Sequence, residues 1–136
     1  MLVGQGSKAD LKADEAAIRA LIASGKTTYT EDNVFWTGLY KRPVVGKEVP
    51  EPFPETKSLK RNNQVNTTKV ERLEFAASGD MAWEFSIVHT EYDSDETPPQ
   101  HRSFEAGMLR VWKKVNGEWK VAATFGRPLN VPFVAH

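Results

Sequence analysis

Two histidines stand at the ends of an acidic segment, HTEYDSDETPPQH, at residues 89–101. These side-chain types bind metals or carry out acid–base catalysis. A hairpin centred on Asp95 would place His89 opposite His101, with Cβ atoms ~5 Å apart. Glu91 shares a face with His89 and could add a carboxylate, which completes a recognised set of metal ligands.

Other features of the same segment favour a turn over a metal site. Pro98 and Pro99 remove hydrogen-bond donors from the strand beside His101, so strict pairing should lapse there. The residues just before the prolines, 93–97, are acidic or carry hydroxyl groups, which is typical of a solvated turn. The acidic residues also lack the glycine and the ligand spacing of a calcium-binding loop. We therefore predict no metal and no organic cofactor, and an exposed turn from Asp93 to Gln100.

Strand alternation connects His89 to a row of apolar side chains. Residues 81–92, MAWEFSIVHTEY, form an expected strand in which alternate residues share a face. His89 continues this row, so it is either a pocket histidine that can move a proton near neutral pH or a partly buried histidine satisfied by a neighbour. The rows of residues that share a face in this way are Met81, Trp83, Phe85, Ile87 and His89; Phe104, Ala106, Met108, Arg110 and Trp112; and Trp119, Val121, Ala123 and Phe125.

The composition limits the class of protein. A chain of 136 residues suits one domain with a sizeable core. Lys plus Arg and Asp plus Glu number 18 each, so no overall field attracts nucleic acid or an anionic membrane. The absence of cysteine excludes disulfides, thiolate metal sites and a cysteine nucleophile. We expect a soluble chain without a membrane span, cytoplasmic by default, although a trimmed exported chain would have the same sequence.

One helix followed by strands is the pattern along the chain. Residues 7–25 carry apolar residues on one stripe at helical spacing, with capping signals at both ends. Between the first two strands, prolines interrupt regular structure, and a short helix is expected from Pro54 to about Asn62. Asn116-Gly117 marks a tight hairpin. The order predicts an α+β domain with a curved antiparallel sheet. The expected strands are 33–38, 67–78, 81–92, 102–115 and 118–126.

Five strings carry a resemblance to a known family. In order, they are DEAAIRALI, YTEDNVFWTG, RPVVGKE, SGDMAW and LRVWKKVNGEWKVAATFGRP. Together they cover about residues 8–128 and resemble the nuclear transport factor 2-like superfamily, in its SnoaL-like and ketosteroid-isomerase-like branch. The resemblance implies a single domain over residues 1–136, with residues 1–7 as a flexible N-terminus and 129–136 as a C-terminal tail.

The implied fold is a cone in which a curved antiparallel sheet wraps around the long N-terminal helix, and a ligand lies in the hollow between them. The opposite sheet face commonly mediates dimerisation in this superfamily. Residues 25–29 leave almost no room for the second helix of relatives, which is therefore expected to be shortened. The proline-rich VPEPFPE replaces a further helix, so the shape of the pocket mouth stays open.

The resemblance also implies where an isomerase would carry its catalytic groups. The base would fall near Thr37, the acid on the oxyanion side near Arg110, and the tyrosine within residues 18–22; none of these residue types is kept. Arg110 would instead suit an anionic or carbonyl-bearing ligand, and a surface arginine without a ligand is the alternative. Candidate catalytic residues are His89, Arg110 and Tyr40. The expected pocket wall, for which core or interface packing is the alternative role, consists of Trp36, Trp83, Phe85, Met108, Trp112 and Phe125.

Three functions follow from these residues. The first is a cofactor-independent isomerase, dehydratase or cyclase that uses His89 as acid–base. The second is a non-catalytic domain that binds or senses a small ligand, and the third is a dimerisation module whose cavity is filled. The expected partners are a small hydrophobic or aromatic molecule and a second copy of the chain that pairs through the sheet.

Overall fold

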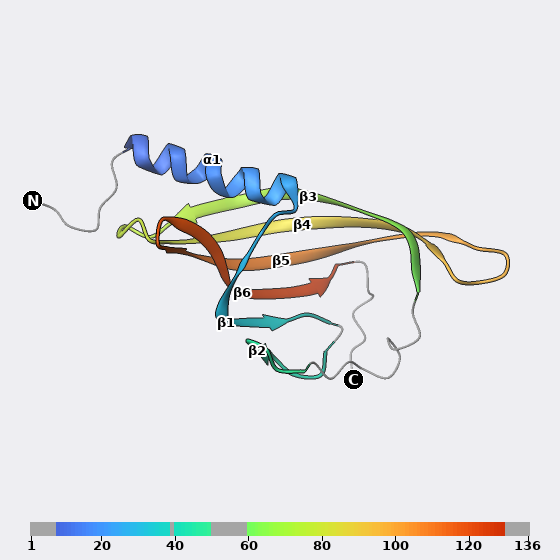
Figure 1. Ribbon diagram of the computed structural model, residues 1–136. Coiled ribbons are helices and arrows are strands. Elements are labelled where there is room, and N and C mark those ends of the chain that lie inside the picture. Colours follow the sequence, from blue (N-terminus) through green and yellow to red (C-terminus); the bar gives the residue numbers. More distant parts are fainter. Residues whose placement is uncertain (1–7, 39, 50–59, 130–136) are drawn as a thin grey trace, which may run out of the picture.

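The structure is a computed structural model that describes residues 8–38, 40–49 and 60–129. One helix precedes a six-stranded sheet with the order β2-β1-β6-β5-β4-β3 (Figure 1). Four of the five described strand pairs are antiparallel, as consecutive hairpins predict, whereas β1 runs parallel to β6. The elements are α1 (Lys8–Ser24), β1 (Tyr29–Trp36), β2 (Val44–Val45), β3 (Arg61–Phe75), β4 (Met81–Ser94), β5 (His101–Val115) and β6 (Glu118–Pro128).

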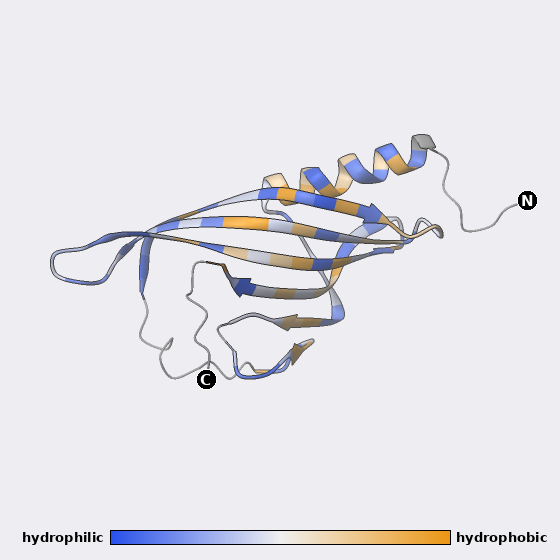
Figure 2. Ribbon diagram, turned by 180° about the vertical axis from the view of Figure 1, so that it is seen from behind, coloured by the Kyte–Doolittle hydropathy of each residue, from blue (hydrophilic) through white to orange (hydrophobic). Residues whose placement is uncertain are grey.

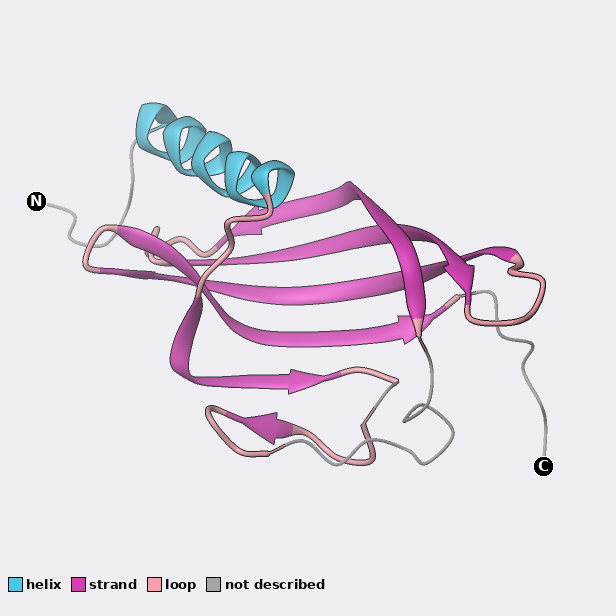
Figure 3. Ribbon diagram, turned by 45° about the vertical axis from the view of Figure 1, so that its right-hand side comes forward, coloured by secondary structure: helices cyan, strands magenta, loops and turns pink. Residues whose placement is uncertain are grey.

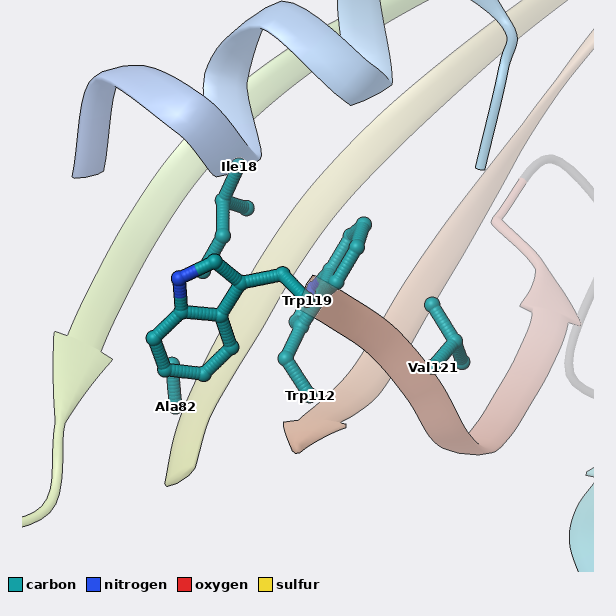
Figure 4. Packing of buried hydrophobic residues seen from close by; sticks show 5 residues of the cluster. All are labelled: Ile18, Ala82, Trp112, Trp119 and Val121. Carbon is teal, nitrogen blue, oxygen red and sulfur yellow. The ribbon is translucent and has the colours of Figure 1, made fainter. Parts of the chain in front are cut away.

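The core lies where α1 packs on the sheet. Ile18 is fully buried and points from α1 onto the indole of Trp119 (Figure 4). Ala82, Trp112 and Val121 complete this cluster from β4, β5 and β6. Hydrophilic and hydrophobic residues alternate along the helix, as expected for an element with one face against the sheet (Figure 2). The large aromatic side chains therefore fill the sheet surface directly beneath the helix.

The sheet has two faces with different roles. It curves from β3, beside the helix, round to β1 and β2 (Figure 3). We call the face that packs against α1 the inner face; it carries Ala82 of β4 and Trp112 of β5, which are paired in register. The outer face carries the alternate residues, such as Trp83 of β4. The β4–β5 turn lies at the far end of the sheet from the N-terminus of α1 (Figure 1).

The turn that follows β2 requires a glycine. Gly46 follows β2 with φ of 58°, and its N–H donates to the carbonyl of Asn33 at 2.8 Å. A Cβ at this position would lie 2.8 Å from the backbone oxygen of Glu31. Only glycine fits here, because both the positive φ and the close approach exclude a side chain.

The long helix and the shortened second helix are confirmed: within the described residues, 25–28 connect α1 to β1 without helical structure. The short helix expected to end near Asn62 is wrong at that end, since Arg61 and Asn62 already belong to β3 and pair with β4. Its remaining part, residues 54–59, lies outside the described residues. No helix in the described part of the chain is long and apolar enough to cross a membrane.

Candidate functional site

The structure separates two rows of side chains that the sequence pattern placed together. The row of β4 with Trp83, Phe85 and His89 pairs with the row of β5 that contains Leu109 and Glu105. Trp83 and Phe85 stay 36% and 40% exposed on the outer face. Their expected position in the helix-side hollow was wrong, because alternation shows which residues share a face and leaves open which face lies under the helix.

A bulge divides the row expected on β6. Trp119 and Val121 are buried on the inner face, whereas Phe125 is 48% exposed and pairs with Leu109 on the outer face. Trp36 of β1 lies beside Phe125, with ring centroids 6.0 Å apart. An extra residue in one strand reverses the face of every residue beyond it. Trp36 and Phe125 therefore belong to the outer face, which corrects their assignment to the hollow.

The β4–β5 hairpin is centred two residues later than expected. Asp93 faces His101, and His89 faces Glu105. The end of the hairpin is closed at Ser94, whose N–H donates to the carbonyl of Gln100 at 2.8 Å. This bond sets the register for the whole pair of strands. The expected pairing of His89 with His101 was therefore wrong.

The histidines and acids of the opening segment instead form a chain along the outer face. His101 contacts Asp93 through Nδ1 at 3.0 Å and Glu91 through Nε2 at 3.2 Å. His89 lies 4.0 Å from the other oxygen of Glu91 and 3.8 Å from Glu105. Within the described residues, no group of three or more such side chains could hold a metal ion.

Mutual contacts shift the acid–base properties of two members of this chain. The Asp93 carboxylate, and after it that of Glu91, raises the pKa of His101 above its ordinary value of 6.5. Hydrogen bonds from Asn63 and then from His101 hold the pKa of Asp93 below its ordinary value of 3.8. The pair therefore favours the ionised form of both partners.

The inner face carries a buried ion pair beside the core. Arg110 of β5 donates from Nε to Oε1 of Glu84 at 2.8 Å and from Nη2 to Oε2 at 2.7 Å. Glu84 is completely buried, while 14% of the Arg110 side chain is accessible. The two hydrogen bonds use Nε and one Nη nitrogen, so Nη1 is not part of the pair. Paired bonds of this kind fix the plane of the guanidinium.

Two further donors complete the contacts of Glu84. The indole N–H of Trp112 donates to Oε1 at 2.8 Å, and the hydroxyl of Ser86 donates to Oε2. Each carboxylate oxygen thus accepts two hydrogen bonds, which compensates the cost of burying the charge. All acceptor positions of the Glu84 carboxylate are therefore used by donors within the protein, and none remains for a ligand.

Three other candidate residues have defined positions. Met108 precedes Arg110 by two residues on the same face of β5 and pairs with Ser86. Tyr40 packs edge-on against Phe35, with centroids 5.9 Å apart. Trp112 is on the inner face but is completely buried in the core, so it supports Arg110 and does not form an open wall.

Sequence reasoning missed Glu84, although a signal for it existed. A glutamate in the middle of an apolar strand needs a partner, and Arg110 is the cation at the matching depth of the next strand. The register that places Glu84 opposite Arg110 also places Asp93 opposite His101, as found. A register that pairs His89 with His101 would instead place Glu84 opposite Ala106 and separate it from Arg110.

Comparisons with known proteins agree on the fold. The sequence matches no protein-family model and no curated protein. The hexachlorocyclohexane dehydrochlorinase LinA-type3 from Novosphingobium barchaimii is similar in structure, with a TM-score of 0.68 and 17% identity over 96% of this chain and 100% of that chain.

Two other solved structures are also similar to this chain. An ntf2-like protein with a cystatin-like fold from Novosphingobium aromaticivorans has a TM-score of 0.56 and 14% identity, over 88% of this chain and 84% of that one. The CamKII hub homology domain from Chlamydomonas reinhardtii has a TM-score of 0.55 and 15% identity, over 92% of this chain and 100% of that chain. The chain therefore has the nuclear transport factor 2-like fold that its sequence resembles.

Proposed function

We propose that this chain is a non-catalytic small-ligand-binding domain in which Arg110 is the polar anchor. The observation that carries the proposal is the buried Glu84–Arg110 pair, in which the carboxylate is inaccessible and the guanidinium is partly accessible. A fixed guanidinium donates to an oxygen without first losing side-chain freedom. The ligand would be a small hydrophobic or aromatic molecule that presents a carbonyl or carboxylate oxygen to Arg110.

The position of the ligand follows from what the core already fills. Ile18, Trp112 and Trp119 occupy the space directly under the helix. We place the ligand farther along the inner face, beside Arg110 and Met108. A ligand position outside the filled core favours small-ligand binding over a dimerisation module whose hollow is filled by its own side chains.

Binding without turnover is favoured over catalysis by the location of the acid–base groups. Both histidines of the described residues, His89 and His101, lie on the outer face. Glu84, on the inner face, has its oxygens occupied by four donors. A similar fold serves a dehydrochlorinase that acts on hexachlorocyclohexane, a small apolar molecule, which supports the ligand class and leaves the reaction unassigned.

Mass spectrometry of small molecules that co-purify with the protein tests the proposal. We expect one oxygen-bearing apolar compound with the wild type and its loss from the double variant Glu84→Gln/Arg110→Gln, which removes both charges and keeps hydrogen-bonding groups. Arg42→Gln, at an exposed ion pair with Glu48, is the matched control and should retain the compound. Retention by the double variant contradicts the role of Arg110, and conversion of the compound by the wild type supports an enzyme instead.

A second copy of this chain is the proposed occupant of the outer face. Apolar side chains gather there at exposures of 36–48%, more than isolated surface residues require. A hub homology domain has a similar fold, which supports association between copies of the chain. The side chains concerned are Val34, Trp36, Met81, Trp83, Phe85, Leu109 and Phe125.

A further inference from the structure

A second ligand site is suggested by a cleft at the far end of the inner face, where β3, β4 and β5 meet beside the β4–β5 turn. The cleft has a volume of about 310 Å³, within the range of small-molecule sites. Arg102 lies eight residues from Arg110 along β5, or ~26 Å at the usual rise of a strand. The cleft is therefore separate from the proposed anchor at Arg110. Its lining residues are Lys60, Arg61, Tyr92, Ser94, Asp95, Glu96 and Arg102.

Arg61 is held in place by aromatic rings. Its guanidinium carbon lies 5.1 Å from the ring centroid of Tyr92 and 4.8 Å from that of Phe104. The two rings contact each other edge-on at 6.3 Å. Stacking engages the face of a guanidinium and leaves the N–H groups at its edge able to donate.

The charges of the cleft favour an anion. Three cationic side chains and two acidic ones line it, and Glu96 is already paired with Arg102. Within the described residues, neither Lys60 nor Arg61 takes part in an ion pair. The positive charge on these two neighbours is thus left without a carboxylate partner in the described structure.

Ser94 adds a neutral donor at the base of the cleft. Its side chain is largely buried, and its Oγ accepts hydrogen bonds from the N–H of Gln100 at 3.0 Å and of Glu96 at 3.4 Å. An oxygen that accepts two hydrogen bonds still carries its own proton, which can be donated to a third group. A hydroxyl fixed in this way next to Arg61 completes a set of donors for one oxyanion.

We propose that this cleft binds a small organic anion, with a carboxylate or phosphate group on the edge of Arg61 and the Ser94 hydroxyl. Lys60 contributes positive charge at the rim. The site is independent of the ligand proposed at Arg110, because it uses other side chains at the other end of the strands.

Titration with benzoate and with phenyl phosphate tests the site and distinguishes the two anion sources. Followed by calorimetry and by backbone amide shifts at low salt, at least one probe should saturate with a dissociation constant of about 1 mM or tighter. The shifts should centre on residues 92–102, and binding should weaken with added salt. Saturation by benzoate alone assigns a carboxylate, and saturation by phenyl phosphate alone assigns a phosphate ester.

Variants of the cleft give the decisive comparison. Arg61→Gln should weaken binding at least about tenfold, since it removes a charge-assisted contact. Lys60→Gln, at an exposed position, should weaken it by a smaller factor and covers the case in which Arg61→Gln fails to fold. Arg72→Gln is the matched control: this arginine is also on β3, lies 5.9 Å from the Trp83 ring, and belongs to the outer face.

Three outcomes would overturn the inference. The first is that neither probe saturates by about 10 mM. The second is equal binding by wild type, Arg61→Gln and Lys60→Gln. The third is a shift pattern centred on Arg110, which would remove the second site and leave the anchor proposed at Arg110 supported.

Discussion

Arg110 and Glu84 face each other across β5 and β4 and share two hydrogen bonds of 2.8 and 2.7 Å, with the carboxylate wholly inside the protein. Burial makes this pair sensitive to the loss of either partner, since the other charge is then left alone in a poorly solvated site. The contact therefore links the stability of the inner face to the residue proposed to meet the ligand.

Removal of one charge should cost more than removal of both. We expect Arg110→Gln to lower the free energy of unfolding by about 3–5 kcal/mol, because Glu84 remains charged and buried. The double variant Glu84→Gln/Arg110→Gln should recover part of this loss. Urea denaturation measures both changes, with Arg42→Gln as an exposed control that leaves the midpoint almost unchanged. Equal loss in the single and double variants would contradict the coupling.

Two glycines with positive φ should respond differently to alanine. Gly46 and Gly117 have φ of 58° and 79°, so both substitutions carry a backbone penalty. A Cβ at Gly46 would approach the backbone oxygen of Glu31 to 2.8 Å, while a Cβ at Gly117 has nothing within 4 Å. Gly46→Ala should be the more destabilising by about 1 kcal/mol or more in thermal or urea unfolding. A smaller effect at Gly46 would show that the turn relaxes.

The His101–Asp93 contact should stabilise the protein only in a limited range of pH. The raised pKa of His101 gives stability that is present below about 6.5 and is lost as pH rises through the folded value. The lowered pKa of Asp93 gives stability that is present above about 3.8 and is lost as pH falls through the folded value. His101→Gln should therefore lower the melting temperature at about pH 5 and have little effect at about pH 9.

Thermal melts across this range, together with an NMR titration of His101, provide the measurement. The same variant at high pH serves as its own control, because the wild-type imidazole is neutral there. A melting temperature that falls equally at both values of pH would assign His101 a packing role instead.

A charge at the centre of the outer face should prevent association. Leu109 is 43% exposed and pairs with Phe85 and Phe125 on its two sides. If a second copy covers this face, Leu109→Lys should convert the protein to a monomer in light scattering after size exclusion, because an unpaired ammonium would be buried. Ala77→Lys, in the exposed β3–β4 turn, is the control and should keep the wild-type mass. A wild-type monomer would contradict the proposed interface.

Local sequence signals determined most of the elements. The apolar stripe of residues 7–25 matches α1, and the alternating segment from residue 81 matches the start of β4. Asn116-Gly117 forms the expected tight turn, with both residues at positive φ. These features depend on the conformations available to a few neighbouring residues, so they are visible in one sequence.

The tertiary structure alone decided which side chains meet. Alternation in β4 gave two possible inner faces, and packing under Ile18 selected the one with Ala82 and Glu84. The closing bonds at Ser94 then fixed a register that separated His89 from His101. A strand pattern repeats every two residues and is unchanged by reversal of its faces, whereas one bulge or a shifted turn changes every cross-strand partner. Long-range packing and hydrogen bonding therefore set the site, although the sequence alone supplied its elements.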